Sequence, residues 1–302
     1  MAAIIRKELA DYFTSIRFFV LFLLVLGFSA AGLYAAYQGV RTALIETGAV
    51  TGQGFVFLTL FTSSGENIPA LVFFIGLFVP IIGIALGFDA INSERSGRTL
   101  SRILSQPVYR DSVINGKFLA GIITLTVMIA TTLLLVSGYG LRMIGVPPTA
   151  EEIIRLFIYL VLTIIFGAFW MGLAMLFSVV TRKIAVSLLI TIAIWFIFFL
   201  WTLVGSALTA SIAQSAEGQL TLMRISPMHL FSEATTVLLV PAYRLGFMTM
   251  TLSQLAYVIP NPLSLGQSML LIWPHLASLI CLSVICFAIS YVLFMRQEIR
   301  AM

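Results

Sequence analysis

The chain has 302 residues, of which 60% are hydrophobic and 10% are charged, and its mean hydropathy is +1.09. A soluble domain carries about 45–50% apolar and about 25% charged residues. This composition therefore excludes an ordinary soluble globular protein, a disordered chain and a coiled coil. Two cysteines exclude a disulfide scaffold. The formal charge of +5 matters less than where the charges lie, because Lys and Arg placement sets the orientation of a membrane protein.

Residues 1–16 combine apolar side chains at helical spacing with the mixed charges of Arg6, Lys7 and Glu8. A full-length apolar run follows directly, so the segment does not resemble a cleavable signal peptide. We interpret it as an amphipathic helix that lies on the cytosolic surface of the membrane. A loose N-terminal tail is the alternative.

Six long apolar runs follow, and none has Asp, Glu or Lys in its middle third. A spanning helix needs about 20 apolar residues, and each run provides them. The sequence therefore predicts an all-α integral membrane protein with one transmembrane domain over residues 1–302. The predicted spans are residues 18–37, 69–88, 118–141, 153–180, 184–210 and 272–295.

The basic residues near the span ends predict the orientation. With a cytosolic N-terminus, the inner side holds twelve of them: Arg6, Lys7, Arg17, Arg95, Arg98, Arg102, Arg110, Lys117, Arg182, Lys183, Arg296 and Arg300. The outer side then holds five: Arg41, Arg142, Arg155, Arg224 and Arg244. The positive-inside rule accordingly places both termini in the cytosol.

Two of the connections are long. Residues 89–117 form a charged inner loop, and residues 211–271 form a partly apolar outer loop. In the outer loop, Ser226 and Pro227 are typical of a helix start, and Pro241 is expected to stop that helix. We predict packed helices or a re-entrant hairpin at the outer membrane face.

Sequence motifs for catalysis are missing. Gly116-Lys117 lacks the upstream glycine and the following hydroxyl of a phosphate-binding loop, so we expect no ATP hydrolysis by this chain. The two histidines, His229 and His275, form no metalloprotease pair. We expect no catalytic residue, no metal site, no cofactor in this chain and no nucleic-acid partner. The pair Gly83-x-x-x-Gly87 indicates close helix packing.

The inner loop carries the most specific pattern. Residues 98–105 can form two helical turns, with apolar residues on one face and arginines on another. Pro107 disfavours a helical conformation at the residue before it and so ends this helix. Asp111 is expected to cap the helix that runs into the third span. A basic loop that only touches anionic lipid is the alternative. The two faces comprise Leu100, Ile103 and Leu104, and Arg98 and Arg102.

The loop resembles the cytosolic loop of ABC-2-type transporter permeases, and the resemblance extends over essentially the whole chain. Within that group the sequence is similar to permeases of drug and antibiotic-resistance exporters and of the nitrous-oxide-reductase maturation system. The matching residues are Glu94, Gly97, Thr99, Leu100, Leu104, Ser105, Pro107, Val108, Arg110, Gly116 and Lys117, with Arg6, Lys7 and Glu8, Ser226 and Pro227, and Phe294, Met295, Arg296 and Glu298.

The resemblance implies a separate cytosolic ATPase, present in two copies, that binds ATP and Mg²⁺. It also implies a second permease, identical or paralogous, in the cell membrane of a bacterium or archaeon. The inner loop would be the coupling helix that docks on the ATPase, with residues 181–183 as a second contact. Its coupling residues would be Glu94, Arg98, Leu100, Arg102, Ile103, Leu104, Pro107 and Arg110.

Two functions are consistent with these patterns. The first is export of a hydrophobic or amphipathic substrate along aromatic residues of the second and fifth spans. The second is an ATPase-driven assembly or signalling protein that acts on an extracytoplasmic partner through residues 211–271. An ion-coupled carrier is disfavoured, because the spans lack buried charges. The candidate path residues are Phe73, Phe74, Phe78, Trp195, Phe196 and Phe199, and membrane lipid is the remaining partner.

Overall fold

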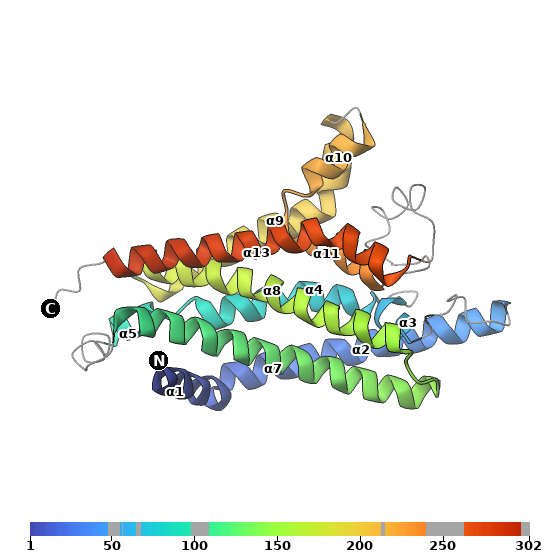
Figure 1. The fold of residues 1–302 in the computed structure, drawn as a ribbon, viewed down its shortest axis with the longest axis horizontal. Coiled ribbons are helices and arrows are strands. Elements are labelled where there is room, and N and C mark those ends of the chain that lie inside the picture. The colour runs from blue at the N-terminus through green and yellow to red at the C-terminus, as the bar shows by residue number, and fades with distance from the viewer. Residues whose placement is uncertain are drawn as a thin grey trace.

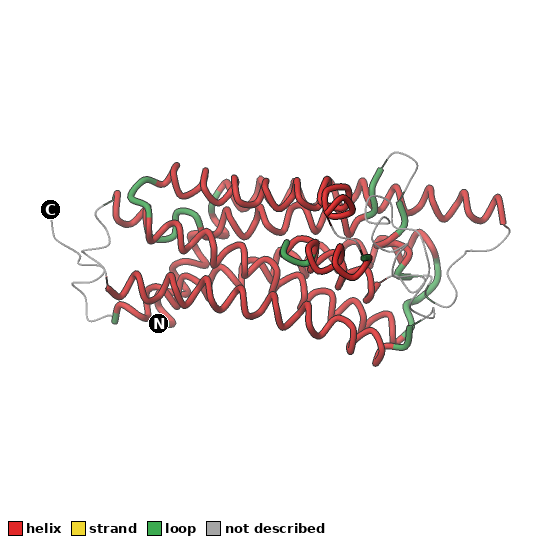
Figure 2. Tube along the Cα trace, turned by 90° about the horizontal axis from the view of Figure 1, so that it is seen from above, coloured by secondary structure: helices red, strands yellow, loops and turns green. Residues whose placement is uncertain are grey.

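The computed structural model describes residues 1–47, 55, 57–64, 68–97, 109–212, 215–239 and 263–296. Within these ranges the regular structure is helical, and none of it is strand. The long helices run roughly side by side in an elongated bundle (Figure 1), and the described loops lie mostly toward its ends (Figure 2).

The described helices divide into long and short ones. The long ones are α2 (Ile16–Thr47), α4 (Leu71–Gly87), α7 (Arg110–Ile144), α8 (Ala150–Val180), α9 (Ile184–Ile212) and α13 (Leu265–Arg296). The shorter ones are α1 (Ala2–Thr14), α3 (Thr59–Thr62), α5 (Asn92–Ser96), α10 (Ala216–Met223) and α11 (Pro227–Leu239).

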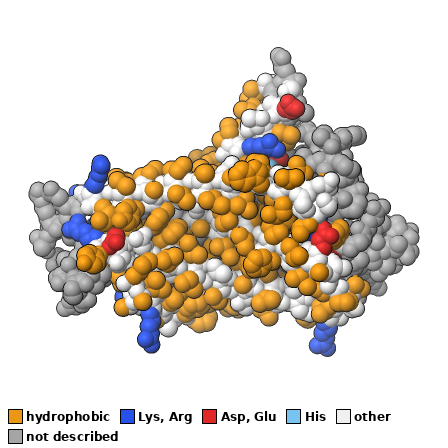
Figure 3. Space-filling model, viewed as in Figure 1, with side chains coloured by type: hydrophobic (Ala, Val, Ile, Leu, Met, Phe, Trp, Pro, Cys, Tyr) orange, Lys and Arg blue, Asp and Glu red, His pale blue; other side chains and the backbone are white. Residues whose placement is uncertain are grey.

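Six of the described helical stretches are long and apolar enough to cross a membrane, which confirms the predicted all-α integral membrane fold. On the face shown in Figure 3, hydrophobic side chains cover the middle of the bundle. Charged side chains on that face lie toward its two ends and on the projecting segment that contains α10. The stretches are Ile16–Gly39, Leu71–Ser96, Arg110–Met143, Ala150–Val180, Ile184–Gly205 and Leu265–Arg296.

Two sequence-based expectations about helix ends differ from the structure. The third long helix begins at Arg110, so Asp111 lies in its first turn and Tyr109 occupies the cap position. The sixth begins at Leu265, so the last residues of the predicted outer loop belong to α13, and Pro274 lies inside that helix. A proline removes one backbone donor, and a helix at membrane depth tolerates this loss where neighbouring groups satisfy the backbone.

Helix α8 lies at the centre of the bundle and packs most extensively against α13 and α4. The contact with α4 is very close, because a Cβ atom on Gly83 would lie 2.6 Å from the Gly167 carbonyl oxygen. A Cβ atom on Gly87 would lie 2.5 Å from the carbonyl oxygen of Met171. The two glycines therefore let the helix backbones touch, as the small-residue motif predicts.

The predicted outer helix is present as α11, which begins at Pro227 as expected. All of its residues are buried, and Phe231 stacks on Phe166 of α8 with ring centroids 4.3 Å apart. Ser226 makes no capping bond through its side chain, although its carbonyl accepts the first helical hydrogen bond from Leu230. Helix α11 therefore belongs to the core of the bundle.

Candidate functional site

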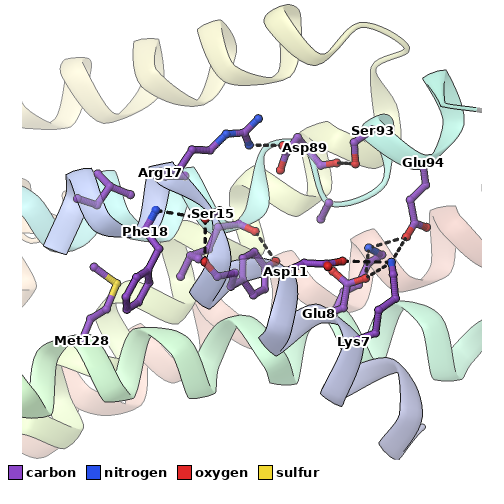
Figure 4. Close-up of a pocket in the computed structure, with 16 residues that line it drawn as sticks. Lys7, Glu8, Asp11, Ser15, Arg17, Phe18, Asp89, Ser93, Glu94 and Met128 are labelled. Carbon is purple, nitrogen blue, oxygen red and sulfur yellow. Dashed lines mark hydrogen bonds and ion pairs between the residues drawn. The ribbon is translucent and has the colours of Figure 1, made fainter.

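A group of buried charges lies where α1, α5 and the start of α7 meet at one end of the bundle (Figure 1). The Lys117 side chain is 4% exposed, and its Nζ lies 2.8 Å from Glu8 Oε1 and 2.9 Å from Glu94 Oε1. Lys7 and Asp11 adjoin these three residues (Figure 4). We call these five residues, Lys7, Glu8, Asp11, Glu94 and Lys117, the inner ion cluster.

Lys7 supplies the second positive charge of the inner ion cluster. Its Nζ lies 3.1 Å from Glu8 Oε1, 3.7 Å from Glu94 Oε1 and 3.5 Å from Asp11 Oδ2. Partial burial alone would lower the pKa of Lys7, but the carboxylates beside it outweigh burial and raise that pKa. Lys7 therefore stays charged and offsets part of the acidic excess around Lys117.

Two further contacts fix α1 in place. A Cβ atom on Gly116 would lie 2.9 Å from Ile4 Cγ2, so the glycine lets α1 approach α7 closely beside Lys117. The Tyr12 hydroxyl donates a 3.0 Å hydrogen bond to the Leu86 carbonyl in the last turn of α4. Burial raises the pKa of Tyr12, which keeps the hydroxyl protonated as a donor.

The start of α2 is joined to the end of α4 by a separate ion pair. Arg17 pairs with Asp89, and its guanidinium lies 5.3 Å from the centroid of the Phe88 ring. Arg17 is more than half exposed, so this pair contributes less stability than the buried contacts of Lys117.

Helix α5 is also bonded to the end of α8. The Ser178 hydroxyl accepts hydrogen bonds from the backbone N–H groups of Ile91 and Asn92, at 3.1 and 3.2 Å. The Asn92 amide donates to the Thr181 hydroxyl at 3.1 Å. The start of the 89–117 loop and the 181–183 turn therefore lie side by side.

A cavity of about 340 Å³ lies beside the inner ion cluster. Its polar wall comes from α1, the end of α4 and α5, and its apolar wall includes Phe18, Leu21 and Met128 (Figure 4). In the part of the chain that the structure describes, no three His, Cys, Asp or Glu side chains are placed to hold a metal ion. The site is suited to holding helices together, since its charges are already paired.

The structure places two of the predicted coupling residues. Glu94 lies in the inner ion cluster, and Arg110 is the first residue of α7. The other six lie outside the described residues: Arg98, Leu100, Arg102, Ile103, Leu104 and Pro107.

The predicted path residues form two aromatic groups. On α4, Phe74 and Phe78 contact Phe28 of α2, with ring centroids 5.2 and 4.7 Å away, and Phe73 contacts Phe74 at 5.8 Å. On α9, the contacts are between Trp195 and Phe199 at 5.7 Å and between Phe196 and Phe199 at 6.5 Å. Their role in a path stays a prediction.

Sequence reasoning missed the residues that organise the opposite end of the bundle. The Arg155 side chain is fully buried and donates to the carbonyl oxygens of Leu238 and Leu263 at 2.8 and 2.7 Å. Glu152 closes a capping box with Thr149 and also accepts from the backbone N–H of Phe57 at 2.8 Å. The capping box was readable from the Thr-x-x-Glu spacing.

Among the described residues, six helices long and apolar enough to cross a membrane, with paired charges near one end of the bundle, define a multi-pass α-helical membrane protein. The model of the ABC-2 family transporter proteins matches residues 2–299, and the chain belongs to this family. It is therefore an ABC-2-type permease. A search of curated proteins found no match.

Proposed function

We propose that this chain is the membrane subunit of an ATP-driven exporter and that two separate cytosolic ATPase subunits move it through the inner ion cluster. Family membership supports a permease that associates with ABC ATPases. The observation that carries the finer proposal is the position of Lys117, which bonds both Glu8 of α1 and Glu94 of α5 from within α7.

The geometry gives a physical route for the motion. Helix α5 leads into the predicted coupling residues, and its Glu94 side chain is held by a nearly unexposed ammonium group on a spanning helix. Moving α5 without α1 and α7 would separate buried opposite charges, and this is costly in a poorly solvated site. A push on the loop is therefore expected to displace α1, α5 and α7 together.

The proposed substrate is hydrophobic or amphipathic. The buried charges among the described residues lie toward the two ends of the bundle and near the base of α10, and the predicted path residues of α4 and α9 are aromatic. Such aromatic side chains offer dispersion and apolar contacts, and they carry no charge of their own to hold an ion. ATP-dependent uptake of hydrophobic dyes into inverted vesicles tests this substrate class.

A second permease copy is supported by helix α9. Only 11% of its most apolar window is buried within this chain, against 67% for the window that contains α4. Toward α10 the helix leaves the bundle (Figure 1). We propose that α9 contributes to the contact between two permeases, which crosslinking through cysteines introduced on its exposed face would detect.

Substitution of the predicted coupling face tests the whole proposal. Leu104→Asp is expected to release the ATPase subunits, because a carboxylate would have to enter an apolar docking contact. The measurement is co-purification from the native membrane with mass spectrometry of bound proteins. Ser105→Asp is the matched control, since it adds the same charge on the opposite face of the predicted helix.

The outcomes separate the alternatives. Recovery of a stoichiometric ATPase with wild type and with Ser105→Asp, and its loss with Leu104→Asp, would support the proposal. An ATPase that stays bound to Leu104→Asp would contradict the coupling assignment, and no ATPase with wild type would contradict the exporter assignment.

A further inference from the structure

The cavity beside the inner ion cluster has a charged part and an apolar part. Its volume of about 340 Å³ lies within the range of small-molecule sites, about 300–1,000 Å³. Lys117 and Met128 of α7 both line it, and their separation in the helix corresponds to about 16 Å along its axis. Figure 4 shows Lys7 on one side of the cavity and Phe18 with Met128 on the other. The cavity therefore has room for a molecule with one polar and one apolar end.

The charged wall carries more carboxylates than cations. The inner ion cluster, whose members all line the cavity, contains three carboxylates and two ammonium groups. The other charged residues of the wall, Arg17 and Asp89, pair with each other and balance. Among the described residues, a molecule in the cavity therefore meets an excess of one negative charge.

Two titratable groups of α1 respond to this excess. Partial burial lowers the pKa of Lys7, but the carboxylates of the cluster raise it by more, so that this pKa rises overall. Burial raises the pKa of Tyr12, which also lines the cavity, and the surrounding carboxylates raise it further. Both directions indicate a negative potential in the cavity, and such a potential attracts a cation.

Asp11 is the carboxylate that a further cation can reach. The side chains of Glu8 and Glu94 are each 8% exposed, and both contact the Lys117 ammonium at less than 3 Å. The Asp11 side chain is 62% exposed, and its Oδ2 lies 3.5 Å from Lys7 Nζ. A cation beside Asp11 would therefore leave the buried contacts of Lys117 intact.

The apolar wall restricts the kind of cation. Phe18 and Leu21 of α2 and Met128 of α7 line this part of the cavity. Their aromatic, aliphatic and thioether groups favour an apolar partner through dispersion and burial of apolar surface. A simple ion would leave this wall without a contact, and an uncharged apolar molecule would leave the negative charge unmatched. An amphipathic cation fits both walls.

We propose that the cavity binds a small organic ammonium ion that carries an apolar group. The ammonium lies beside Asp11, and the apolar group lies against Phe18, Leu21 and Met128. Because the lining residues come from α1, α2, α4, α5 and α7, the bound molecule contacts the helices that the inner ion cluster joins. The proposal concerns binding to this chain alone and does not depend on the proposed export function.

Saturation-transfer NMR of the full chain in dodecyl maltoside, an uncharged detergent, tests the proposal with benzyltrimethylammonium as the probe. We expect saturable binding that empty micelles do not show. Tetramethylammonium lacks the apolar group and phenylmethanesulfonate has the opposite charge, so each should bind at least about tenfold more weakly. No saturable binding of the probe up to about 10 mM, or equal binding of phenylmethanesulfonate, would overturn the proposal.

Two variants locate the bound probe. Asp11→Asn should weaken binding about three- to fivefold, because it removes the negative charge that the ammonium contacts. Glu217→Gln removes the same charge from the exposed surface of α10 and is the matched control, with wild-type binding expected. Ala85→Leu, which adds a side chain to the cavity wall and leaves every charge in place, should abolish binding and covers the case in which Asp11→Asn does not fold. Wild-type binding in both Asp11→Asn and Ala85→Leu would overturn the proposal.

A soluble amine and a lipid headgroup can both supply such an ammonium group. Competition between the probe and short-chain lipids distinguishes these sources. Displacement by dihexanoylphosphatidylcholine alone would support a lipid headgroup in the cavity, and displacement by neither lipid would support a soluble ammonium compound. Stronger displacement by dihexanoylphosphatidylglycerol, which carries no ammonium, would show that the cavity prefers anions and would overturn the proposal.

Discussion

The two ion clusters have opposite charge arrangements. At the inner cluster one buried ammonium, Lys117, lies between the carboxylates of Glu8 and Glu94. At the outer ion cluster, which comprises Arg224, Glu233 and His275, one buried carboxylate, Glu233, lies between a guanidinium and an imidazole. Each cluster fastens a peripheral helix to the bundle, α1 in the first case and, through Arg224, α10 in the second.

The difference lies in how far the charged groups are buried. Lys117, Glu8 and Glu94 are each at most 8% exposed, whereas Arg224 in the outer cluster is 41% exposed. A buried charge that loses its partner cannot turn to water, so the inner cluster is expected to contribute more to stability than the outer one. Four variants test this contrast.

The largest effect is expected from Lys117→Met. The substitution removes the buried cation and leaves Glu8 and Glu94 with the more exposed Lys7 as their remaining cation, and removing one partner of a buried ion pair costs about 3–5 kcal/mol of stability. Thermal unfolding in detergent measures the loss. Arg142→Met, at the exposed far end of the same helix, is the control and should stay close to wild type.

A combined variant separates charge balance from packing at the inner cluster. Glu8→Gln, Glu94→Gln and Lys117→Met together leave no net charge to bury, so much of the lost stability should return. If the triple variant were as unstable as Lys117→Met alone, packing of the lysine stem would be the dominant contribution instead.

Glu233→Gln is expected to have the next largest effect, a loss of about 2–3 kcal/mol. The loss is smaller than at Lys117 because the Arg224 side chain, left without its carboxylate, is 41% exposed and can turn to water. Glu217→Gln on the exposed surface of α10 is the control, and thermal unfolding at neutral pH is the measurement. An equal loss in both variants would show that the cluster contributes nothing specific.

The loss of stability at acid pH depends in part on the pKa of Glu233. The pKa of Glu233 is lowered to about 2 in the folded protein. The paired carboxylate therefore stabilises the fold at pH values above the ordinary pKa of a glutamate, and this contribution is lost as the pH falls toward about 2. Unfolding of wild type and Glu233→Gln should therefore converge between about pH 5 and about pH 2. Parallel curves over that range would place the acid sensitivity in other carboxylates.

The smallest effect is expected from Asp11→Asn. The Asp11 and Lys7 side chains are 62% and 55% exposed and lie 3.5 Å apart, and exposed pairs of this kind contribute about 0.2–1 kcal/mol. The change should be near the lower limit and should disappear in high salt. A loss of stability as large as that of Lys117→Met would mean that the exposed pair of Asp11 and Lys7 contributes as much stability as the buried contacts of Lys117.

The sequence predicted the features that depend on local pattern. Six apolar runs predicted the six helices that can span a membrane, Gly83 and Gly87 predicted a close helix contact, and Pro227 predicted the start of α11. Each follows from hydrophobic length, small-residue spacing or a helix-start signal within a single segment. The predicted helix ends were less accurate. Helix α7 begins at Arg110, several residues before the apolar run from which the third span was predicted.

The ion clusters could not be predicted because their members are far apart in the chain. Lys117 and Glu8 are 109 residues apart, and nothing in either local segment selects the other as a partner. Lys117 beside the third apolar run also had a simpler interpretation as a boundary charge that faces water. Arg155 was counted as such a boundary charge, yet its guanidinium is fully buried among carbonyl oxygens.

The Arg155 guanidinium also bears on how much the length of residues 240–262 can change. Arg155 donates hydrogen bonds to the carbonyl oxygens of Leu238 and Leu263, which lie on either side of residues 240–262. One side chain therefore holds the two flanks of this stretch close together. Closing a chain between fixed ends costs free energy that grows only with the logarithm of its length. Insertions within residues 240–262 should therefore leave the spanning helices intact, which makes this stretch a place where the protein can gain length at little cost to its fold.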